Sequence, residues 1–225
     1  MGSHFEKYET EGVSQFEIGS DSEEHCIYML KISLSKYQLN ECLNSFCWTF
    51  KIGDNILYNL DLIFQLVDDH NKLAGRKYAK PISILCVSVI EGALVDFLER
   101  LDSATRHFPS KLDSKKKDIK KELEGKKNDF EIIYKGKVYK YKRLKNFGYK
   151  ELIKFYEDFK ILGSRSADYQ ILQELGRFRN RVHIQNYFRN FEQNESCTFS
   201  ENRSQRAIDY MESVFKYLSK NYPRP

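Results

Sequence analysis

The stretch from Ile82 to Leu101 restricts the fold more than any other, because its first half is apolar almost all the way round. Pro81 stands just before it, where a helix favours proline in its first turn. After Glu91 the pattern becomes amphipathic. A helix that is apolar on every side must be covered by other elements. We therefore predict that Ile82–Leu101 is the central, most buried helix of a bundle.

Apolar residues at helical spacing also identify the partners of this helix. Only four prolines and eleven glycines interrupt the 225 residues, which favours long elements. Four other segments show the spacing: 54–73, 149–162, the segment that follows Ser164 or Ser166, and 202–222. Lys36–Phe46 has the pattern of a further short helix. Two long helices before a basic insertion and three after it predict an all-α bundle of about five helices.

The N-terminal part of the chain differs in character. Residues 1–23 are polar and acidic and have the composition of a loose arm. Between residues 24 and 34 apolar side chains alternate with others, as in a strand, and Cys47–Ile52 is a candidate second strand. We therefore expect an N-terminal extension at 1–50 with a small β element, followed by the bundle at 51–225.

Composition narrows the class of protein. Hydrophobic residues make up 41% of the chain and charged residues 31%, as in soluble globular proteins. The longest apolar run, Ile82–Ile90, is far too short for a membrane span, and no signal-peptide pattern opens the chain. Five scattered cysteines without a Cys-x-x-Cys pair indicate reduced thiols. We expect a cytoplasmic protein with no membrane attachment, no structural metal and no cofactor.

Positive charge is concentrated in an insertion at 104–148. From Lys111 to Lys145 fourteen Lys and Arg residues face six Asp and Glu, a local charge of +8, so the remaining residues sum to −3 against the total of +5. Such a concentrated patch suits nucleic acid better than a uniformly basic surface does. Within it, Lys111–Lys127 has the composition of either a charged helix or a disordered stretch.

The rest of the insertion predicts a β-hairpin. Phe130–Tyr134 and Lys137–Lys142 read as two short strands around a tight turn at Lys135 and Gly136. Tyrosines and lysines alternate along the second strand, which gives one aromatic face and one cationic face. These faces could stack bases and hold phosphates, or the tyrosines could cover the bundle while the lysines keep it soluble. The candidate RNA-binding residues are Lys135, Lys137, Tyr139, Lys140 and Lys142.

The segment Leu175–Asn186 gathers three arginines, Asn180 and a histidine in the second half of an amphipathic helix. Its predicted apolar stripe consists of Leu172, Leu175, Phe178 and Val182. Arg179 and Asn180 lie four and three residues before His183, so the three are expected to share the exposed face. Arg177 is about 240° from His183 around an ideal helix and needs a kink or a second subunit to join them. A cation, an amide and an imidazole can bind and cleave a phosphodiester; a solvated helix end is the alternative.

Glu91 is a carboxylate in the middle of the apolar helix. Such a group is costly unless it is paired. It could face solvent or form a structural salt bridge with an arginine. The other interpretation is that Glu91 orients an arginine of the Arg177–Arg181 cluster.

These features together resemble the HEPN superfamily. Its motif is an arginine followed, after about four to six residues, by a histidine late in a helix of an all-α bundle, typically with Asn, Asp or His beside the arginine. Five residues separate Arg177 from His183, which fits the spacing of the motif. Arg179 has the expected Asn180 beside it, but only three residues separate it from His183. The resemblance covers about residues 51–103 and 149–222 and leaves the N-terminal part and the insertion outside it.

The resemblance implies a metal-independent endoribonuclease that is active as a homodimer, often in a toxin–antitoxin or antiviral system with an antitoxin or defence partner protein. In such cleavage the 2′-OH of the RNA attacks its own phosphate. His183 would move protons, because histidine titrates near neutral pH. Arg177 or Arg179 would stabilise the phosphate, and Asn180 would orient it or the imidazole.

Other functions remain open. One branch of the family has a tyrosine two residues after the histidine, and a partner nucleotidyltransferase modifies that tyrosine. In this chain the position is occupied by Gln185. A non-catalytic helical module that binds RNA or a protein through the basic insertion is the main alternative to the enzyme. A small nucleotide-binding accessory protein is the third.

Overall fold

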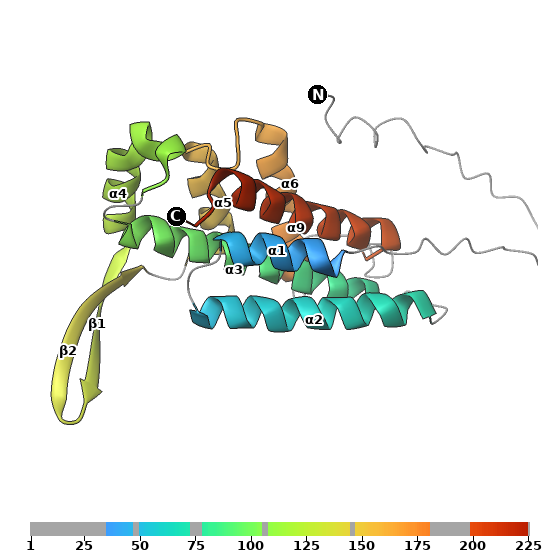
Figure 1. Ribbon diagram of the computed structural model, residues 1–225, viewed down its shortest axis with the longest axis horizontal. Coiled ribbons are helices and arrows are strands. Elements are labelled where there is room, and N and C mark those ends of the chain that lie inside the picture. Colours follow the sequence, from blue (N-terminus) through green and yellow to red (C-terminus); the bar gives the residue numbers. More distant parts are fainter. Residues whose placement is uncertain are drawn as a thin grey trace, which may run out of the picture.

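The computed structural model describes residues 35–46, 50–72, 78–104, 108–144, 147–180 and 199–224, without the side chains of 36, 37, 50, 51, 141–143 and 178–180. The elements in chain order are α1 (Lys36–Phe46), α2 (Phe50–Lys72), α3 (Ala79–Ser103), the 3-10 helix η3 (Ser110–Lys115), α4 (Lys116–Glu124), β1 (Lys127–Tyr134), β2 (Lys137–Leu144), α5 (Tyr149–Asp158), α6 (Ser166–Asn180) and α9 (Glu201–Asn221). Figure 1 shows a helical bundle from which the hairpin of β1 and β2 projects at one end.

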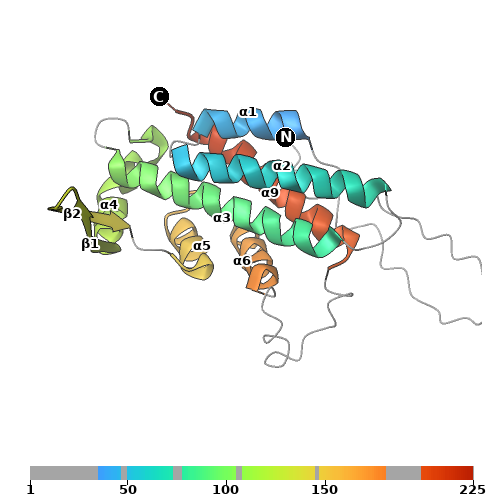
Figure 2. The same cartoon turned by 90° about the horizontal axis from the view of Figure 1, so that it is seen from below.

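α3 is the centre of the bundle, as predicted. It contacts α2, α9, α6, α5 and α4, and in Figure 2 it lies between α1 and α2 on one side and α5 and α6 on the other. Its length and composition would also suit a membrane span, but most of its apolar window is buried by the other helices, as in a core helix. Its fully buried side chains include Ile82, Cys86, Ile90, Leu94 and Phe97.

α1 belongs to the same core. It packs against α9, and its buried face consists of Leu39, Leu43 and Phe46. The ring of Phe46 meets that of Phe215 edge-on, with 5.3 Å between centroids. The core of the bundle therefore reaches into the region 1–50.

The strand expected at Cys47–Ile52 is wrong for its last three residues, because α2 begins at Phe50. Ile52 stands four residues before Ile56, and both lie on the side of α2 that packs against α3. Helical burial on α3 thus outweighs the β preference of a short apolar run. The strand expected between residues 24 and 34 lies outside the described residues.

The end of the chain is tied back to the core. The Arg100 side chain donates hydrogen bonds to the carbonyl oxygens of Tyr222 (2.5 Å) and Pro223 (2.6 Å). The Tyr222 hydroxyl donates to Ile161 O at 2.7 Å, and Arg224 N donates to Ser45 O at 2.8 Å. α9 is thereby fixed to α3, to the turn after α5 and to α1.

The Lys-rich segment is helical rather than disordered. It forms η3 and α4, which bury Leu112, Ile119 and Leu123 and leave Lys111, Lys117 and Lys121 exposed. Lys127 pairs with Asp102 at the end of α3, with 2.9 Å between Nζ and Oδ1. A few apolar contacts and this ion pair dock the insertion onto the bundle.

The predicted hairpin is confirmed, with longer strands than expected. Its antiparallel register runs from Lys127 opposite Leu144 to Tyr134 opposite Lys137. The two turn residues, Lys135 and Gly136, have φ values of 50° and 73°, as the tight turns of two-residue hairpins require. The all-helical class with a β-hairpin is therefore confirmed, and α1 and α4 raise the number of helices in the described ranges above the expected five.

Candidate functional site

α6 carries the start of the arginine-rich segment and is held firmly at its beginning. The Tyr169 hydroxyl donates to Gly163 O at 2.8 Å and accepts from Leu162 N at 3.1 Å. Gly163 has a φ of 105°, which ends the preceding turn and suits only glycine well. The buried side of α6 consists of Tyr169, Leu172, Leu175 and Gly176.

Gly176 brings α6 close to α5. A Cβ atom built at residue 176 would lie 2.3 Å from Cδ1 of Tyr149, so any other residue would displace the ring. Tyr149 is itself buried at the start of α5. This contact fixes the position of α6 one residue before Arg177.

Only part of the predicted catalytic set lies within the described residues. Arg177 is exposed on the last turns of α6. Arg179 and Asn180 belong to the helical backbone of α6, with side chains outside the description, and His183 follows the described residues. Of Arg177, Arg179, Asn180 and His183, Arg177 is therefore the one residue whose side chain is among those described.

Two residues of the predicted apolar stripe of α6, Leu172 and Leu175, are buried, and Gly176 is buried beside them. Position 179 follows Leu172 by seven residues and is only about 20° round the helix from it. Because Leu172 is buried, backbone position 179 lies on the side of α6 that faces the bundle. The exposed Arg177 lies on the solvent side. The expectation that residue 179 shares the exposed face came from placing Phe178 in the apolar stripe. The side chain of Phe178 itself lies outside the described residues.

Glu91 is half-buried on α3, beside the fully buried Ile90. It takes part in a polar or electrostatic interaction, so it is not an isolated buried carboxylate. Because α3 packs against α6, Glu91 stays a candidate for positioning an arginine of the Arg177–Arg181 cluster. The described contacts do not include one between Glu91 and an arginine.

A groove between α6 and α9 adds two arginines that the sequence did not point to. It encloses about 110 Å³ and is lined by Ile171, Glu174 and Leu175 of α6 and by Arg203 and Arg206 of α9. Arg206 is exposed and Arg203 is half-buried. Their distance in sequence from the motif, on a helix with an ordinary amphipathic pattern, gave no signal of this arrangement.

The first turn of α9 holds these arginines in a fixed place. The Ser200 hydroxyl caps the helix by accepting from Arg203 N at 3.4 Å. The Ser204 hydroxyl donates to Ala79 O at 3.0 Å and lies 3.1 Å from that of Ser83. The start of α9 is therefore joined to the start of α3 through buried hydroxyl groups.

Charge around the groove is mixed. Burial raises the pKa of Tyr210, while the charge of Arg206 and a hydrogen bond from it act in the opposite direction. Burial also raises the pKa of Asp168, and Arg165 partly offsets that rise. Two arginines and Glu174 thus line the same groove.

The candidate RNA-binding residues on the hairpin are surface-exposed. Lys135 lies over the ring of Tyr134, with Nζ 5.2 Å from the ring centroid, and Lys137 and Tyr139 are exposed. Lys140 pairs with Glu131 of the opposite strand, at 2.9 Å from Nζ to Oε1. The cationic face is therefore partly neutralised within the hairpin, and the side chain of Lys142 lies outside the description.

A second hollow, of about 220 Å³, lies between α2 and α3 beside Gly92. One of its amides and its hydroxyl are already used locally: Asn59 Nδ2 donates to Asn55 O at 2.7 Å and the Ser88 hydroxyl to Ile84 O at 3.0 Å. Nothing there offers reactive chemistry. Within the described ranges, no three His, Cys, Asp or Glu side chains gather as metal ligands would.

The chain matches no protein-family model, and comparison with curated proteins and with solved structures finds no match either.

Proposed function

We propose that the protein is a metal-independent endoribonuclease of the HEPN type, with its reactive groups at the C-terminal end of α6. The observation that carries the proposal is the exposed Arg177 on a helix whose opposite side is fixed by the contact of Gly176 with Tyr149. A rigid support of this kind suits a residue that must meet a phosphate in one geometry. The helical class with a β-hairpin agrees with it.

The proposed reaction needs only the side chains of this segment. The 2′-OH of the RNA attacks the adjacent phosphorus, the 5′-oxygen leaves, and a 2′,3′-cyclic phosphate and a 5′-hydroxyl result. His183 exchanges the protons. Arg177 or Arg179 stabilises the charge on the pentavalent phosphorus, and Asn180 orients the phosphate or the imidazole. One histidine cannot serve as separate acid and base, so we expect a homodimer to supply the second.

Arg203 and Arg206 extend the proposed site. They stand on α9 across a groove from Glu174 and Leu175 of α6, the turn just before Arg177. Planar guanidinium groups bind phosphate through paired hydrogen bonds. We therefore assign them to neighbouring phosphates of the RNA rather than to the phosphate that is cleaved.

The hairpin supplies the second RNA contact in this proposal. Lys135 and Lys137 are exposed cations, and Tyr139 is an exposed ring beside them. Bases stack on such rings while cations track the backbone. The expected setting is a cytoplasmic toxin or phage-defence system with an antitoxin or defence partner, and Glu91 would act through an arginine rather than on the RNA.

Incubation of RNA with the purified protein in excess EDTA tests the proposal. The wild type should cut the RNA, and His183→Ala should lower the rate by a factor of about 10²–10⁴. A Lys220→Ala variant, altered at an exposed position near the end of α9, should cut at the wild-type rate. If the wild type binds the RNA but leaves it intact, the proposed ribonuclease activity is wrong.

That last outcome would favour the second candidate, a non-catalytic RNA-binding module. The specific observation on its side is the exposed hairpin, where aromatic rings and cations stand together. It predicts binding that weakens as hairpin lysines are neutralised, whatever occupies position 183.

A further inference from the structure

Six of the eight exposed large hydrophobic side chains in the described part of the chain lie on the hairpin. On the face of β1 and β2 that carries Phe130, the side chains of Ile132, Tyr134 and Tyr139 are 49%, 58% and 51% exposed. On the other face Ile133 and Val138 are 76% and 55% exposed. Exposed apolar groups gathered in this way mark contact sites, and an isolated two-stranded ribbon is marginally stable without a third partner.

The hairpin is also basic. Residues 127–144 contain six Lys and Arg against Asp129 and Glu131, a net charge of +4. Two of the six are already paired: Lys140 with Glu131, and Lys127 with Asp102 and Glu124. An occupant that matches this surface carries apolar side chains among acidic ones.

The chain itself contains such a segment. Residues 5–24 hold seven acidic residues against the single Lys7, a net charge of −6. Apolar residues are interspersed among the acids: Phe5, Tyr8, Val13, Phe16 and Ile18. Charge and apolar pattern of this acidic arm therefore both complement the hairpin.

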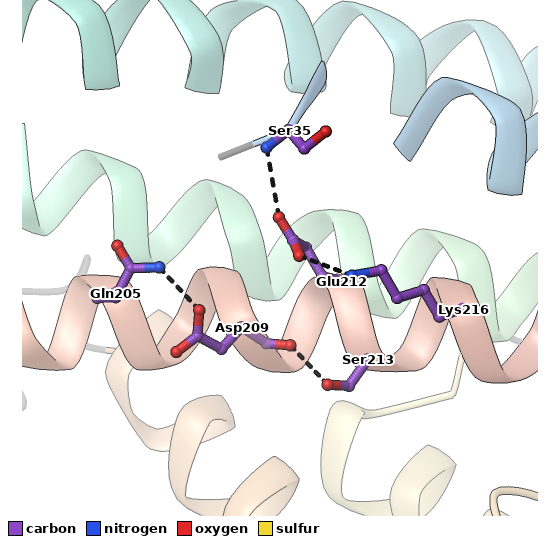
Figure 3. Close-up of polar contacts among 6 residues, drawn as sticks. All are labelled: Ser35, Gln205, Asp209, Glu212, Ser213 and Lys216. Carbon is purple, nitrogen blue, oxygen red and sulfur yellow. Dashed lines mark hydrogen bonds and ion pairs between the residues drawn. The ribbon is translucent and has the colours of Figure 1, made fainter. Parts of the chain in front are cut away.

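The arm leaves the bundle at a defined point. Figure 3 shows Ser35 beside α9, where its backbone N–H donates to Glu212 Oε1 at 3.4 Å. Glu212 Oε2 accepts from Lys216 Nζ at 3.1 Å, which fixes the carboxylate. From Ser35 an extended chain would carry Glu24 up to about 36 Å and Phe5 up to about 100 Å away, whereas α3 measures about 38 Å. The arm can thus reach the hairpin of its own chain.

We propose that the acidic arm, Phe5–Glu24, docks on the hairpin of the same chain. Its apolar side chains cover Ile132, Tyr134 and Tyr139, and its carboxylates face Lys137 on the same face and Lys135 at the turn. The docking rests on the hairpin surface and on the sequence of the arm, and does not require the protein to cleave RNA. If the hairpin binds RNA as well, the arm competes with RNA for the same surface.

Hydrogen exchange tests the docking. Backbone amides of residues 128–142 are compared in the full chain and in a variant lacking residues 2–24, at equal folded fraction. We expect exchange to be at least fivefold faster in the deletion variant, and faster in the full chain at high salt than at low salt. Equal rates in the two proteins would overturn the proposal.

A second variant guards against an effect of the deletion on folding. Glu17→Lys, Asp21→Lys and Glu23→Lys together keep the length of the arm but reverse its charge, and should speed hairpin exchange like the deletion. Exchange that speeds up when the full chain is diluted would show that the arm of a second copy is the occupant, against docking in the same chain. If the deletion changes neither RNA binding nor the exchange of the hairpin amides, the arm does not dock on the hairpin, and RNA is the partner of that surface. The EDTA cleavage assay fails or succeeds independently of these results.

Discussion

Gly176 on α6 lies so close to Tyr149 on α5 that a Cβ atom at residue 176 would stand 2.3 Å from Cδ1 of the ring. The two residues join the start of one helix to the end of another, one residue before Arg177. The lack of a side chain at 176 therefore lets this turn of α6 pack directly against α5.

Gly176→Ala should destabilise the protein although alanine favours helix. The helix gain is about 1 kcal/mol, but forcing the Tyr149 ring aside costs about 1–3 kcal/mol. Urea unfolding followed by circular dichroism measures the difference. In a Tyr149→Leu background, where the ring is gone, the same change should be neutral or stabilising. A more stable Gly176→Ala single variant would show that the ring moves freely.

Arg100→Met should loosen the C-terminal end of the chain. It removes the donors to Tyr222 O and Pro223 O, which are inside or at the edge of the core. Hydrogen bonds from charged donors and the carbonyls they leave behind are each worth about 1.5–3 kcal/mol. We expect a loss of about 2–4 kcal/mol in the free energy of unfolding. Lys220→Met, at an exposed site on α9, is the control and should change it little. A similar loss in both variants would refute the role of Arg100.

Stability should fall at alkaline pH because of buried tyrosines. Burial raises the pKa of Tyr156, Tyr169 and Tyr222 above the ordinary value of 10.0. Above about pH 10 the unfolded chain loses these protons while the folded chain keeps them. The free energy of unfolding then decreases as pH rises, by up to about 1.4 kcal/mol per pH unit for each tyrosine, and the contribution is complete below that pH.

The slope separates this effect from a general loss of structure. Tyr156→Phe removes one titrating group, together with the hydrogen bond from its hydroxyl to Leu94 O at 2.6 Å. Its stability at pH 8 should be lower, but its decline between pH 10 and 11 should be shallower than that of the wild type. Urea midpoints measured across this range give both quantities. An equal decline in both proteins would contradict the assignment.

Arg203→Ala and Arg206→Ala should each weaken RNA binding without abolishing the fold. Loss of one phosphate contact lowers the slope of log affinity against log salt by about 0.7 for single-stranded RNA. Filter binding at several salt concentrations, with the His183→Ala background to prevent cleavage, measures it. Lys220→Ala serves as the matched cation on the same helix. Equal slopes for all three variants would remove the α6–α9 groove from the proposed site.

Much of the architecture followed from local patterns. Lys36–Phe46 was predicted with the observed bounds, and the strands around Lys135 and Gly136 were expected from the turn. Short apolar runs without a clear period were harder. The residues before Asp54 were placed in a strand, because the packing of Ile52 against α3 is not visible in six residues of sequence.

Contacts between different helices at the candidate site could not be predicted from the sequence. The stripe through Leu172 and Leu175 was predicted from hydropathy and both residues are buried. Hydropathy gives no weight to a glycine, so the burial of Gly176 beneath the Tyr149 ring was missed. Arg203 and Arg206 come near α6 only through the packing of α9. The Lys140–Glu131 pair could have been foreseen, since a two-residue turn at Lys135 and Gly136 sets residue 131 opposite 140.

The most direct test of the ribonuclease proposal is single-turnover cleavage of an end-labelled RNA in EDTA, with and without one 2′-deoxy nucleotide at the site of cleavage. The wild type should cut the all-ribose RNA there, leaving a 2′,3′-cyclic phosphate, and should leave the 2′-deoxy RNA intact at that position. His183→Ala, shown to be folded, should cut neither. Equal cleavage of both RNAs by the wild type, or equal rates for wild type and His183→Ala, would contradict the proposed site at the end of α6.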